Sequence, residues 1–254
     1  MRTEYTGLST LYDLLMDDVD YDLWADRIDS LLRSVYSGTG AVSVMDCACG
    51  TGAISIRLAK KGYRVTGTDI SSDMLRVAYE NALKNGVRIP FVQMDMAELK
   101  AMRPVQAINC SCDGVNYLTS MPRVKRFFTC ANRALVKEGL LMFDVSTRYK
   151  LSEVIGCNTF GEDRRECTYL WMNTYDPAEK LVQMRLALFT PGKDGSYQRF
   201  DETHIQRAHS HTELVNALTG CGFTLEGAYD GITAQPMSET SERVLYVARK
   251  SGEI

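Results

Sequence analysis

Three aspartates follow short apolar runs of the chain, and the first of them leads into a glycine-bearing turn. Asp46 begins the stretch Asp-Cys-Ala-Cys-Gly-Thr-Gly, which contains Gly50 and Gly52, while Asp69 and Asp95 end the next two runs. In an open α/β sheet, ligands bind beyond the carboxyl ends of the strands. Glycine lets the backbone bend tightly and come close to a ligand that a side chain would block. We therefore expect the three carboxylates to line one ligand site.

The three acidic positions suit a ligand that carries an ammonium group, a ribose and an adenine but no phosphate. A carboxylate at Asp46 would repel a pyrophosphate and attract an ammonium group. Asp69 can accept hydrogen bonds from both hydroxyls of a ribose, and Asp95 is placed for the exocyclic amine of adenine. S-adenosylmethionine has these three groups. The nicotinamide alternative needs a third glycine where Ser55 stands, so the GxGxxG motif is incomplete.

The elements that must position these residues alternate between strand and helix patterns from residue 41 to about residue 146. Ser71 or Ser72 caps the second helix and Gly86 ends it, which is the usual asymmetry of helix ends. Repeated strand–helix–strand units predict a parallel, doubly wound sheet with right-handed crossovers. The expected strands are 41–46, 64–69, 90–95, 107–112 and 139–145, and the expected helices are 53–61, 71–85 and 122–136.

The pattern changes between residues 157 and 208, where apolar and polar residues alternate with a period of two. Turn signals at Asp176-Pro177 and at residues 192–195 separate these runs. They predict an antiparallel β-meander inserted into the α/β unit. The three runs are 166–175, 180–189 and 197–206.

The last part of the chain returns to the first pattern. Ser210 and Glu213 form a capping box that begins a helix, and two strands near 223–229 and 243–249 complete a seven-stranded, mostly parallel sheet. The fold class is therefore α/β. We expect residues 1–40 to form an N-terminal helical cap, 41–156 and 209–254 the cofactor-binding α/β domain, and 157–208 an antiparallel insertion on the substrate side.

Three motifs carry a resemblance to a known family. Residues 44–52 (Val-Met-Asp-Cys-Ala-Cys-Gly-Thr-Gly) resemble the first motif of class I S-adenosylmethionine-dependent methyltransferases, 66–71 their acidic ribose loop and 93–96 their adenine loop. Residues 12–24 resemble a bacterial subgroup of small-molecule methyltransferases, and a looser similarity extends to amino-sugar N-methyltransferases. The resemblance implies the Rossmann-like methyltransferase fold and S-adenosylmethionine as the cofactor.

The same resemblance assigns cofactor-binding positions. Family first motifs usually carry glycine at the position of Ala48 or Cys49, so this loop departs from the pattern and is expected to be less flexible. The implied cofactor-binding residues are Tyr12, Asp46, Ala48, Cys49, Gly50, Asp69, Ile70, Met74, Asp95, Met96 and Cys112.

Two residues, Tyr117 and Tyr5, are candidate catalytic residues that would contact the molecule that accepts the methyl group. In the amino-sugar enzymes a histidine base lies where Tyr117 falls, and a tyrosine near the N-terminus matches Tyr5. A phenol ionises near pH 10 and is a poor base at neutral pH unless it is perturbed, so Tyr117 is equally well interpreted as a packing or hydrogen-bonding residue. The Asn/Asp-Pro-Pro-Tyr/Phe run of enzymes that methylate adenine or planar amides is missing, which counts against a nucleic-acid or protein-glutamine target.

Two further groups of residues have a functional and a structural interpretation. Aromatic and polar side chains alternate at 169, 171, 173 and 175, where they could cover a cationic substrate, but packing is favoured because such strand faces are usually buried. His204, His209 and His211 do not have a zinc-ligand spacing, and the cysteines occur as Cys-x-Cys pairs at strand ends. We expect no metal site.

Composition and charge limit the partners and the location that we expect for this protein. The chain has 254 residues, a net charge of −3 and a pI near 5.7, so it has no general attraction for phosphate backbones. No apolar run approaches the length of a membrane helix, and the N-terminus lacks a secretory signal. These features predict a cytoplasmic protein, monomeric or homodimeric, with a small-molecule substrate and neither a nucleic-acid nor a membrane partner.

The implied activity is transfer of a methyl group to an N or O nucleophile of a small molecule. Such an enzyme needs alignment and exclusion of water more than a strong base, which agrees with a clear cofactor site and no evident catalytic dyad. One alternative is a non-catalytic regulator or partner protein that binds S-adenosylmethionine. A tRNA or protein methyltransferase is disfavoured.

Overall fold

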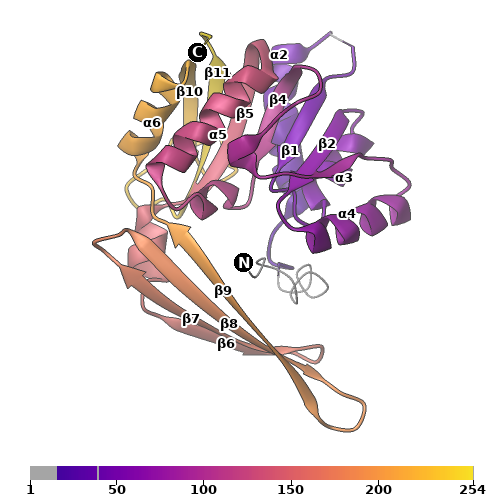
Figure 1. The fold of residues 1–254 in the computed structure, drawn as a ribbon, viewed down its shortest axis with the longest axis vertical. Coiled ribbons are helices and arrows are strands. Elements are labelled where there is room, and N and C mark those ends of the chain that lie inside the picture. Colours follow the sequence, from indigo (N-terminus) through magenta and orange to yellow (C-terminus); the bar gives the residue numbers. More distant parts are fainter. Residues whose placement is uncertain (1–15, 39, 254) are drawn as a thin grey trace.

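Seven strands form the central sheet of the computed structural model, which describes residues 16–38 and 40–253. Their order is β10-β11-β5-β4-β1-β2-β3, with β11 antiparallel to both of its neighbours and the other pairs parallel (Figure 1). This confirms the predicted doubly wound, mostly parallel sheet. The strands are β1 (Ser43–Cys47), β2 (Arg64–Asp69), β3 (Phe91–Gln93), β4 (Val105–Cys110), β5 (Leu135–Ser146), β10 (Phe223–Asp230) and β11 (Arg243–Lys250).

Helices cover both faces of this sheet because its strands are apolar on both sides. Along β1, Met45 and Cys47 join one buried cluster and Val44 joins the other, as expected for a parallel sheet that is covered on both faces. Helices α5 (Met121–Ala134) and α6 (His211–Gly220) pack on the first face, and α2 (Tyr21–Tyr36), α3 (Ala53–Lys60) and α4 (Ser72–Lys84) pack on the second.

Side-chain caps begin several of these helices where the sequence predicts them. The Ser71 hydroxyl accepts a hydrogen bond from the backbone N–H of Met74 at the start of α4. Ser210 and Glu213 form the complete capping box of α6. The main differences in boundaries are β5, which begins at Leu135 instead of residue 139, and β3, which ends at Gln93 instead of Asp95. As an edge strand, β3 pairs only with β2, so the chain is free to turn away and Asp95 instead caps the short helix η1 (Met96–Glu98).

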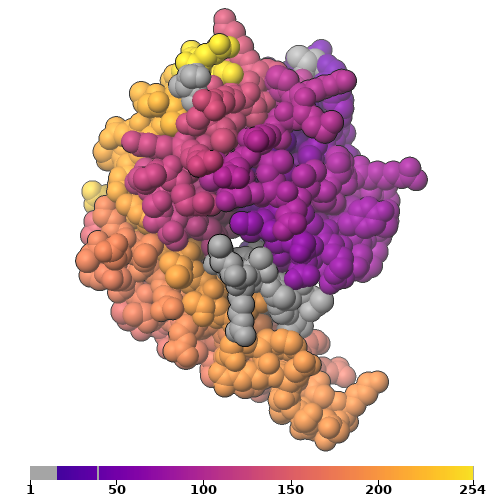
Figure 2. All heavy atoms as spheres, in the orientation of Figure 1, coloured from indigo at the N-terminus to yellow at the C-terminus, as the bar shows by residue number. Residues whose placement is uncertain are grey.

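The inserted segment forms a separate antiparallel sheet of four strands, in the order β6-β7-β8-β9. Its strands are β6 (Thr159–Asp163), β7 (Thr168–Asp176), β8 (Leu181–Pro191) and β9 (Tyr197–Arg207). Sequence analysis predicts the last three but not β6, because all five β6 residues are exposed and give no alternation. This sheet extends away from the α/β unit, and Figure 2 shows it as an orange lobe below that unit.

One buried asparagine joins the insertion to the central sheet. Asn116, in the short helix η2 (Gly114–Tyr117), donates from Nδ2 to the carbonyl oxygens of Ser146 (3.0 Å) and Arg207 (2.9 Å) and accepts from the Ser146 N–H (2.9 Å). Ser146 ends β5 and Arg207 ends β9. The insertion therefore leaves and returns at the carboxyl-end edge of the sheet. In the part of the chain that the structure describes, no helix combines the length and apolar character needed to cross a membrane.

Candidate active site

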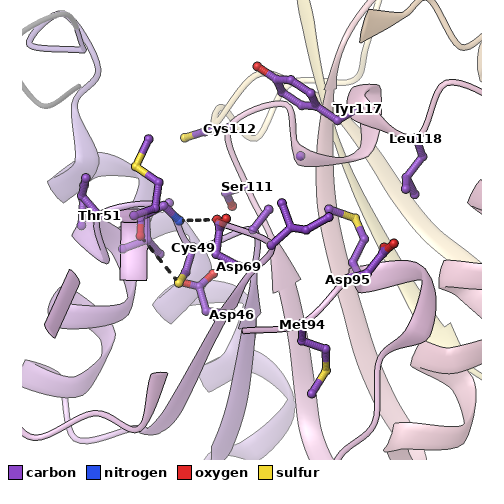
Figure 3. A pocket seen from close by; sticks show the side chains of 18 of the residues that line it. Asp46, Cys49, Thr51, Asp69, Met94, Asp95, Ser111, Cys112, Tyr117 and Leu118 are labelled. Atoms are coloured by element: carbon purple, nitrogen blue, oxygen red, sulfur yellow. Dashed lines mark hydrogen bonds between the residues drawn. The ribbon is translucent and has the colours of Figure 1, made fainter. Parts of the chain in front are cut away.

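A cleft opens at the carboxyl ends of β1 to β4, where the sequence-predicted acidic residues meet (Figure 3). Of the expected cofactor residues, all but Tyr12 line this cleft; Tyr12 and the catalytic candidate Tyr5 lie outside the described residues. Tyr117 also lines it. The lining residues that sequence analysis does not single out are Tyr21, Thr51, Ala53, Ile54, Met94, Ser111, Gly114, Leu118 and Arg123.

The loop after β1 turns through three left-handed residues. Ala48, Gly50 and Gly52 have φ angles of 50°, 53° and 81°, a region that glycine adopts without a steric penalty. A Cβ atom on Gly52 would lie 3.1 Å from the Cβ of Ala78 on α4, a tight contact, so the close approach of loop and helix also favours glycine. Of the two positions at which family motifs usually carry glycine, Ala48 adopts the left-handed conformation that glycine favours despite its methyl group.

Asp69 lies at the end of β2 with both carboxylate oxygens directed at the loops of the cleft. Its Oδ2 accepts from the Gly50 N–H (2.9 Å) and its Oδ1 from the Ser71 N–H (2.9 Å). Each oxygen keeps a second acceptor position. Burial raises the pKa of Asp69. A carboxylate that is fixed by two backbone amides is well suited to accept hydrogen bonds from the two hydroxyls of a ribose.

Asp46 lies deeper, at 2% exposure, and its carboxylate accepts two side-chain hydrogen bonds. The Ser55 hydroxyl donates to Oδ2 (2.5 Å) and the Asn109 amide donates to Oδ1 (2.8 Å). Burial raises the pKa of Asp46 to about 6, against the effect of these two donors. A cation bound beside Asp46 would offset this burial cost. Ser55, whose presence interrupts the dinucleotide motif, thus has a direct role in supporting the acid.

The far end of the cleft combines apolar side chains with one ion pair. Asp95 accepts from the Ala97 N–H through Oδ1 (2.9 Å) and from Arg123 on α5 through Oδ2 (2.7 Å). Ile70 is 54% exposed although it is apolar, and Met96 lies beside Asp95 in the chain. An exposed isoleucine at a cleft provides a surface on which a planar ring can pack. Arg123 was not foreseen, because its distance in sequence from Asp95 gives no signal.

A buried ion cluster fixes the loop that follows β4. Cys112 and Asp113 are both left-handed, with φ angles of 62° and 68°, and their N–H groups donate to Asp144 at 2.6 and 3.3 Å. The Arg243 guanidinium pairs with Asp113 (2.5 Å) and with Asp144. Burial raises the pKa of Asp144 to about 6. At Asp113 burial also acts to raise the pKa, but the charges of Arg243 and Lys150 and the hydrogen bonds from Ser146 and Arg243 together outweigh it, so the pKa is lowered. Burial also raises the pKa of the Cys112 thiol, which therefore stays protonated.

On the side of the cleft expected to hold the methyl acceptor, Tyr117 meets a histidine of β9, and this histidine in turn contacts a glutamate of the same strand. The Tyr117 hydroxyl lies 3.4 Å from Nδ1 of His204, and Nε2 of His204 lies 3.2 Å from Oε2 of Glu202. The Tyr117 and His204 rings meet edge to face with centroids 6.0 Å apart. Sequence analysis considers His204 only as a metal ligand and does not consider Glu202. The available signal is their spacing of two, which places both on one face of a strand.

Residues 44–139 match a methyltransferase domain family. Over 251 residues the chain is 36% identical to YqeM of Bacillus subtilis (strain 168), with 98% of each chain covered, and over 246 residues it is 35% identical to GWCH70_2453 of Geobacillus sp. (strain WCH70), with 97% and 99% covered. Both are named as methyltransferases without a substrate.

The chain belongs to the class I S-adenosylmethionine-dependent methyltransferases. An S-adenosylmethionine-dependent methyltransferase from Clostridium acetobutylicum has a TM-score of 0.87 at 28% identity, with 98% of this chain and 99% of that chain covered. The sugar N-methyltransferase KedS8 from Streptoalloteichus has a TM-score of 0.77 at 19% identity, with 95% and 93% covered, and shares the fold.

The cleft of this methyltransferase fits S-adenosylmethionine by the chemistry of its lining side chains. Asp46 offers a buried carboxylate to an ammonium group, Asp69 offers paired acceptors to a diol, and Ile70 offers an apolar surface to a ring. Among the described lining residues, Arg123 is the one basic side chain, and it is paired with Asp95. This charge pattern suits a ligand without phosphate.

The aromatic residues of β7 and the histidines considered as metal ligands do not form part of the cleft in the described structure. Trp171 and Tyr175 pack against a buried cluster that contains Leu151 and Val182, which agrees with the favoured packing interpretation. The cross-strand register places Tyr169, Trp171, Asn173 and Tyr175 on one face, and none of these four is among the described residues that line the cleft. Within residues 16–38 and 40–253, no three His, Cys, Asp or Glu side chains are grouped to hold a metal ion.

Proposed function

We propose that this methyltransferase transfers a methyl group to an N or O nucleophile of a small molecule. The observation that carries the proposal is the position of Tyr117, whose hydroxyl lines the same cleft as the cofactor residues and lies beside His204 of β9, which in turn contacts Glu202. Such side chains are suited to an acceptor that must lose a proton. The similarity in fold to the sugar N-methyltransferase KedS8 makes amino-bearing small molecules the first class to test.

Binding is attributed to the cleft residues described above. We assign Asp69 to the ribose hydroxyls, Asp46 to the ammonium group, and Asp95 with Ile70 and Met96 to the adenine. When bound, S-adenosylmethionine supplies a methyl group that its sulfonium charge already activates. The protein then contributes mainly alignment and exclusion of water. The fixed loops at Ala48–Gly52 and Cys112–Tyr117 serve the alignment, because their backbone is held by hydrogen bonds to Asp69 and Asp144.

The substrate side is assigned to the insertion, residues 157–208. Its strand β9 ends at the same edge of the central sheet as the cofactor residues and contacts Tyr117 directly. A sheet on the opposite edge would have excluded this role. The acidic lining of the cleft, with Asp46, Asp69 and Asp95, disfavours a nucleic-acid acceptor because phosphate groups would be repelled.

The test is a transfer assay with tritium-labelled S-adenosylmethionine and three fractions of a Bacillus subtilis extract: ultrafiltered small molecules, total tRNA and dialysed protein. We expect label in the small-molecule fraction. Asp69→Ala, which removes the ribose acceptor, serves as the control for transfer that depends on this site. Label confined to tRNA or protein would overturn the small-molecule proposal. Saturable cofactor binding with no label in any fraction would favour a non-catalytic regulator instead.

A further inference from the structure

We propose that Asn109 is a positioning residue for the cofactor, because its side chain holds Asp46 and Ser111 so that both present acceptor oxygens to one ammonium group in the cleft. This inference rests on the proposed function, which assigns Asp46 to the ammonium group of S-adenosylmethionine, and deepens it by adding Ser111 as a second ligand of that group. Asn109 is not among the described residues that line the cleft. It therefore acts through these two neighbours.

The strands that carry Asp46 and Asn109 are neighbours in the central sheet. In the parallel register of β1 and β4, Asp46 is opposite Asn109, and Val44 is opposite Ala107. Side chains two positions apart along a strand share a face, so the two pairs follow each other on one face of the sheet. Val44 and Ala107 belong to one buried apolar cluster. The side chains of this face thus change from apolar to polar where the strands approach the cleft.

Packing alone does not explain this polar pair. Asp46 and Asn109 are only 2% and 0% exposed, and polar groups are costly to bury unless they are paired. They do pair with each other, but two apolar residues of similar shape can replace a buried hydrogen-bonded pair at little or no cost in stability. Ligand binding explains the pair, because Asp46 and Ser111 both line the cleft (Figure 3).

The hydrogen bonds around Asn109 fix the direction of its amide. An ionised carboxylate only accepts hydrogen bonds, so the Asn109 atom that lies 2.8 Å from Oδ1 of Asp46 is the Nδ2 donor. The amide oxygen points away from Asp46 and accepts from the Ser111 hydroxyl at 2.9 Å. Because Ser111 uses its one hydroxyl proton in this bond, its oxygen can only accept from a ligand. Asn109 thus turns both neighbours into acceptors.

The acceptors that remain suit a cationic donor group. Oδ1 of Asp46 accepts from Asn109 and Oδ2 accepts from Ser55, and a carboxylate has about four acceptor positions in all. An ammonium group has three donors, whereas a hydroxyl has one. Acceptors from both Asp46 and Ser111 therefore favour a nucleoside that carries an ammonium group over one that lacks it.

The charges around Asp46 make the contribution of Asn109 measurable. Burial raises the pKa of Asp46 to about 6 and the negative charge of Asp69 on β2 adds to this rise, whereas the hydrogen bond from Asn109 is among those that lower it. The nearby thiols of Cys47 and Cys49 stay protonated, because burial raises their pKa. Removing the Asn109 amide should therefore raise the pKa of Asp46 further.

The experiment compares two nucleosides by isothermal titration. S-adenosylhomocysteine carries the ammonium group, and methylthioadenosine has the same adenine and ribose but no amino-acid arm, so the ratio of their dissociation constants reports contacts to the arm. At neutral pH, Asn109→Leu and Ser111→Ala should each weaken S-adenosylhomocysteine by about 10-fold or more, the value of one hydrogen bond to a charged group. Methylthioadenosine should change by less than about twofold. The double variant should lose less than the product of the two single losses, because Asn109 acts partly through Ser111.

The pH dependence of the ratio is a readout that altered packing would not move. In the wild type, the preference for S-adenosylhomocysteine should increase as the pH rises through about 6, because Asp46 becomes ionised. Ionisation of Asp69 acts on both ligands through the ribose. Asn109→Leu should move the midpoint to higher pH, and Ser111→Ala should leave it in place, since the Ser111 hydroxyl bonds Asn109 rather than Asp46.

Matched controls lie at the other end of the same two strands. There the N–H of Ser43 on β1 donates to Oε1 of Gln106 beside it on β4 (2.8 Å). Gln106→Leu and Ser43→Ala repeat the two substitutions away from the cleft and should retain the wild-type ratio. Binding of methylthioadenosine shows that each variant is folded, and Asn109→Ser, which is smaller and keeps a polar atom, replaces Asn109→Leu if the latter does not bind it.

The outcomes separate this inference from the assignment on which it rests. A wild-type ratio in the Asn109 variant or in Ser111→Ala would overturn the inference, and so would equal weakening of both ligands. Asp46→Asn tests the assignment itself, because an unchanged ratio there would remove Asp46 from the ammonium site. A lowered ratio in Asp46→Asn with no effect at Asn109 would refute the positioning role alone. The methyl-transfer assay decides the small-molecule proposal independently of these binding measurements.

Discussion

Replacing Asp46 by asparagine should stabilise the protein and weaken cofactor binding at the same time. Burial raises the pKa of Asp46 from 3.8 to about 6, so the folded protein binds this proton more tightly than the unfolded chain does. Stability then falls as the pH rises from about 3.8 to 6 and is lowest above that range. A difference of about two pH units corresponds to about 3 kcal/mol at neutral pH.

Asparagine removes this charge but not the whole benefit of the carboxylate. Its Oδ1 can still accept from Asn109, while its Nδ2 must donate to Ser55, whose own hydroxyl proton loses its acceptor. That loss costs about 1 kcal/mol. We therefore expect Asp46→Asn to be more stable than the wild type by about 2 kcal/mol at pH 7.5. The gain should be about 1 kcal/mol smaller at pH 5, where the wild-type carboxyl is largely protonated.

Urea unfolding at pH 7.5 and pH 5, followed by circular dichroism, measures both values. Asp26→Asn is the matched control, because Asp26 forms an exposed ion pair with Lys61 and the change should stay within about 0.5 kcal/mol at either pH. Isothermal titration should show S-adenosylmethionine affinity reduced by about 1.5–3 kcal/mol in Asp46→Asn. A variant that is less stable than the wild type at pH 7.5, or equally changed at both pH values, would refute the argument from burial.

Three other substitutions test separate parts of the site. Asp69→Ala should weaken S-adenosylmethionine binding by about 1.5–3 kcal/mol in isothermal titration, and an unchanged dissociation constant would place Asp69 outside the ribose site. Arg243→Met leaves the buried Asp144 and the partly buried Asp113 without their cation and should lower the free energy of unfolding by about 3–5 kcal/mol. Arg249→Met, whose partner Glu226 is more exposed, should cost less than about 1 kcal/mol. Equal effects in urea unfolding would contradict this assignment. Ala48→Gly should change the free energy of unfolding by less than about 1 kcal/mol, because relief of the left-handed strain offsets the greater entropy of the unfolded chain. The control Ala59→Gly, in α3, should lower the free energy of unfolding by about 1 kcal/mol. A larger loss for Ala48→Gly than for Ala59→Gly, measured by thermal unfolding, would be inconsistent with strain at Ala48.

The central sheet could be predicted because each of its elements carries a local signal. Apolar runs, caps such as Ser71 and stops such as Gly86 depend only on near neighbours in the chain. The acidic residues at strand ends could be predicted for a related reason. In a parallel sheet, the direction of the strands brings their carboxyl ends to one edge, so Asp46 and Asp69 meet without any knowledge of side-chain packing.

The contacts that the sequence did not indicate join segments that are distant in the chain. Arg123 reaches Asp95 from another element, and His204 reaches Tyr117 across 87 positions. Neither contact follows from periodicity, because each depends on how a loop or the inserted sheet packs against the core. The strand β6 was missed for a different reason. It is an exposed edge strand, and its residues do not need the alternation that a buried face imposes.

Ser55 supports the same conclusion about the ligand from the sequence and from the structure. In the sequence, Ser55 counts only against a nicotinamide dinucleotide, because it stands where a third glycine is required. In the structure, its hydroxyl donates to Asp46 and opposes the rise of the pKa that burial causes. Glycine at this position would remove that donor and make an ionised Asp46 more costly. The serine that is incompatible with the pyrophosphate motif therefore also favours the anion that an ammonium group needs, and both effects select the same kind of ligand.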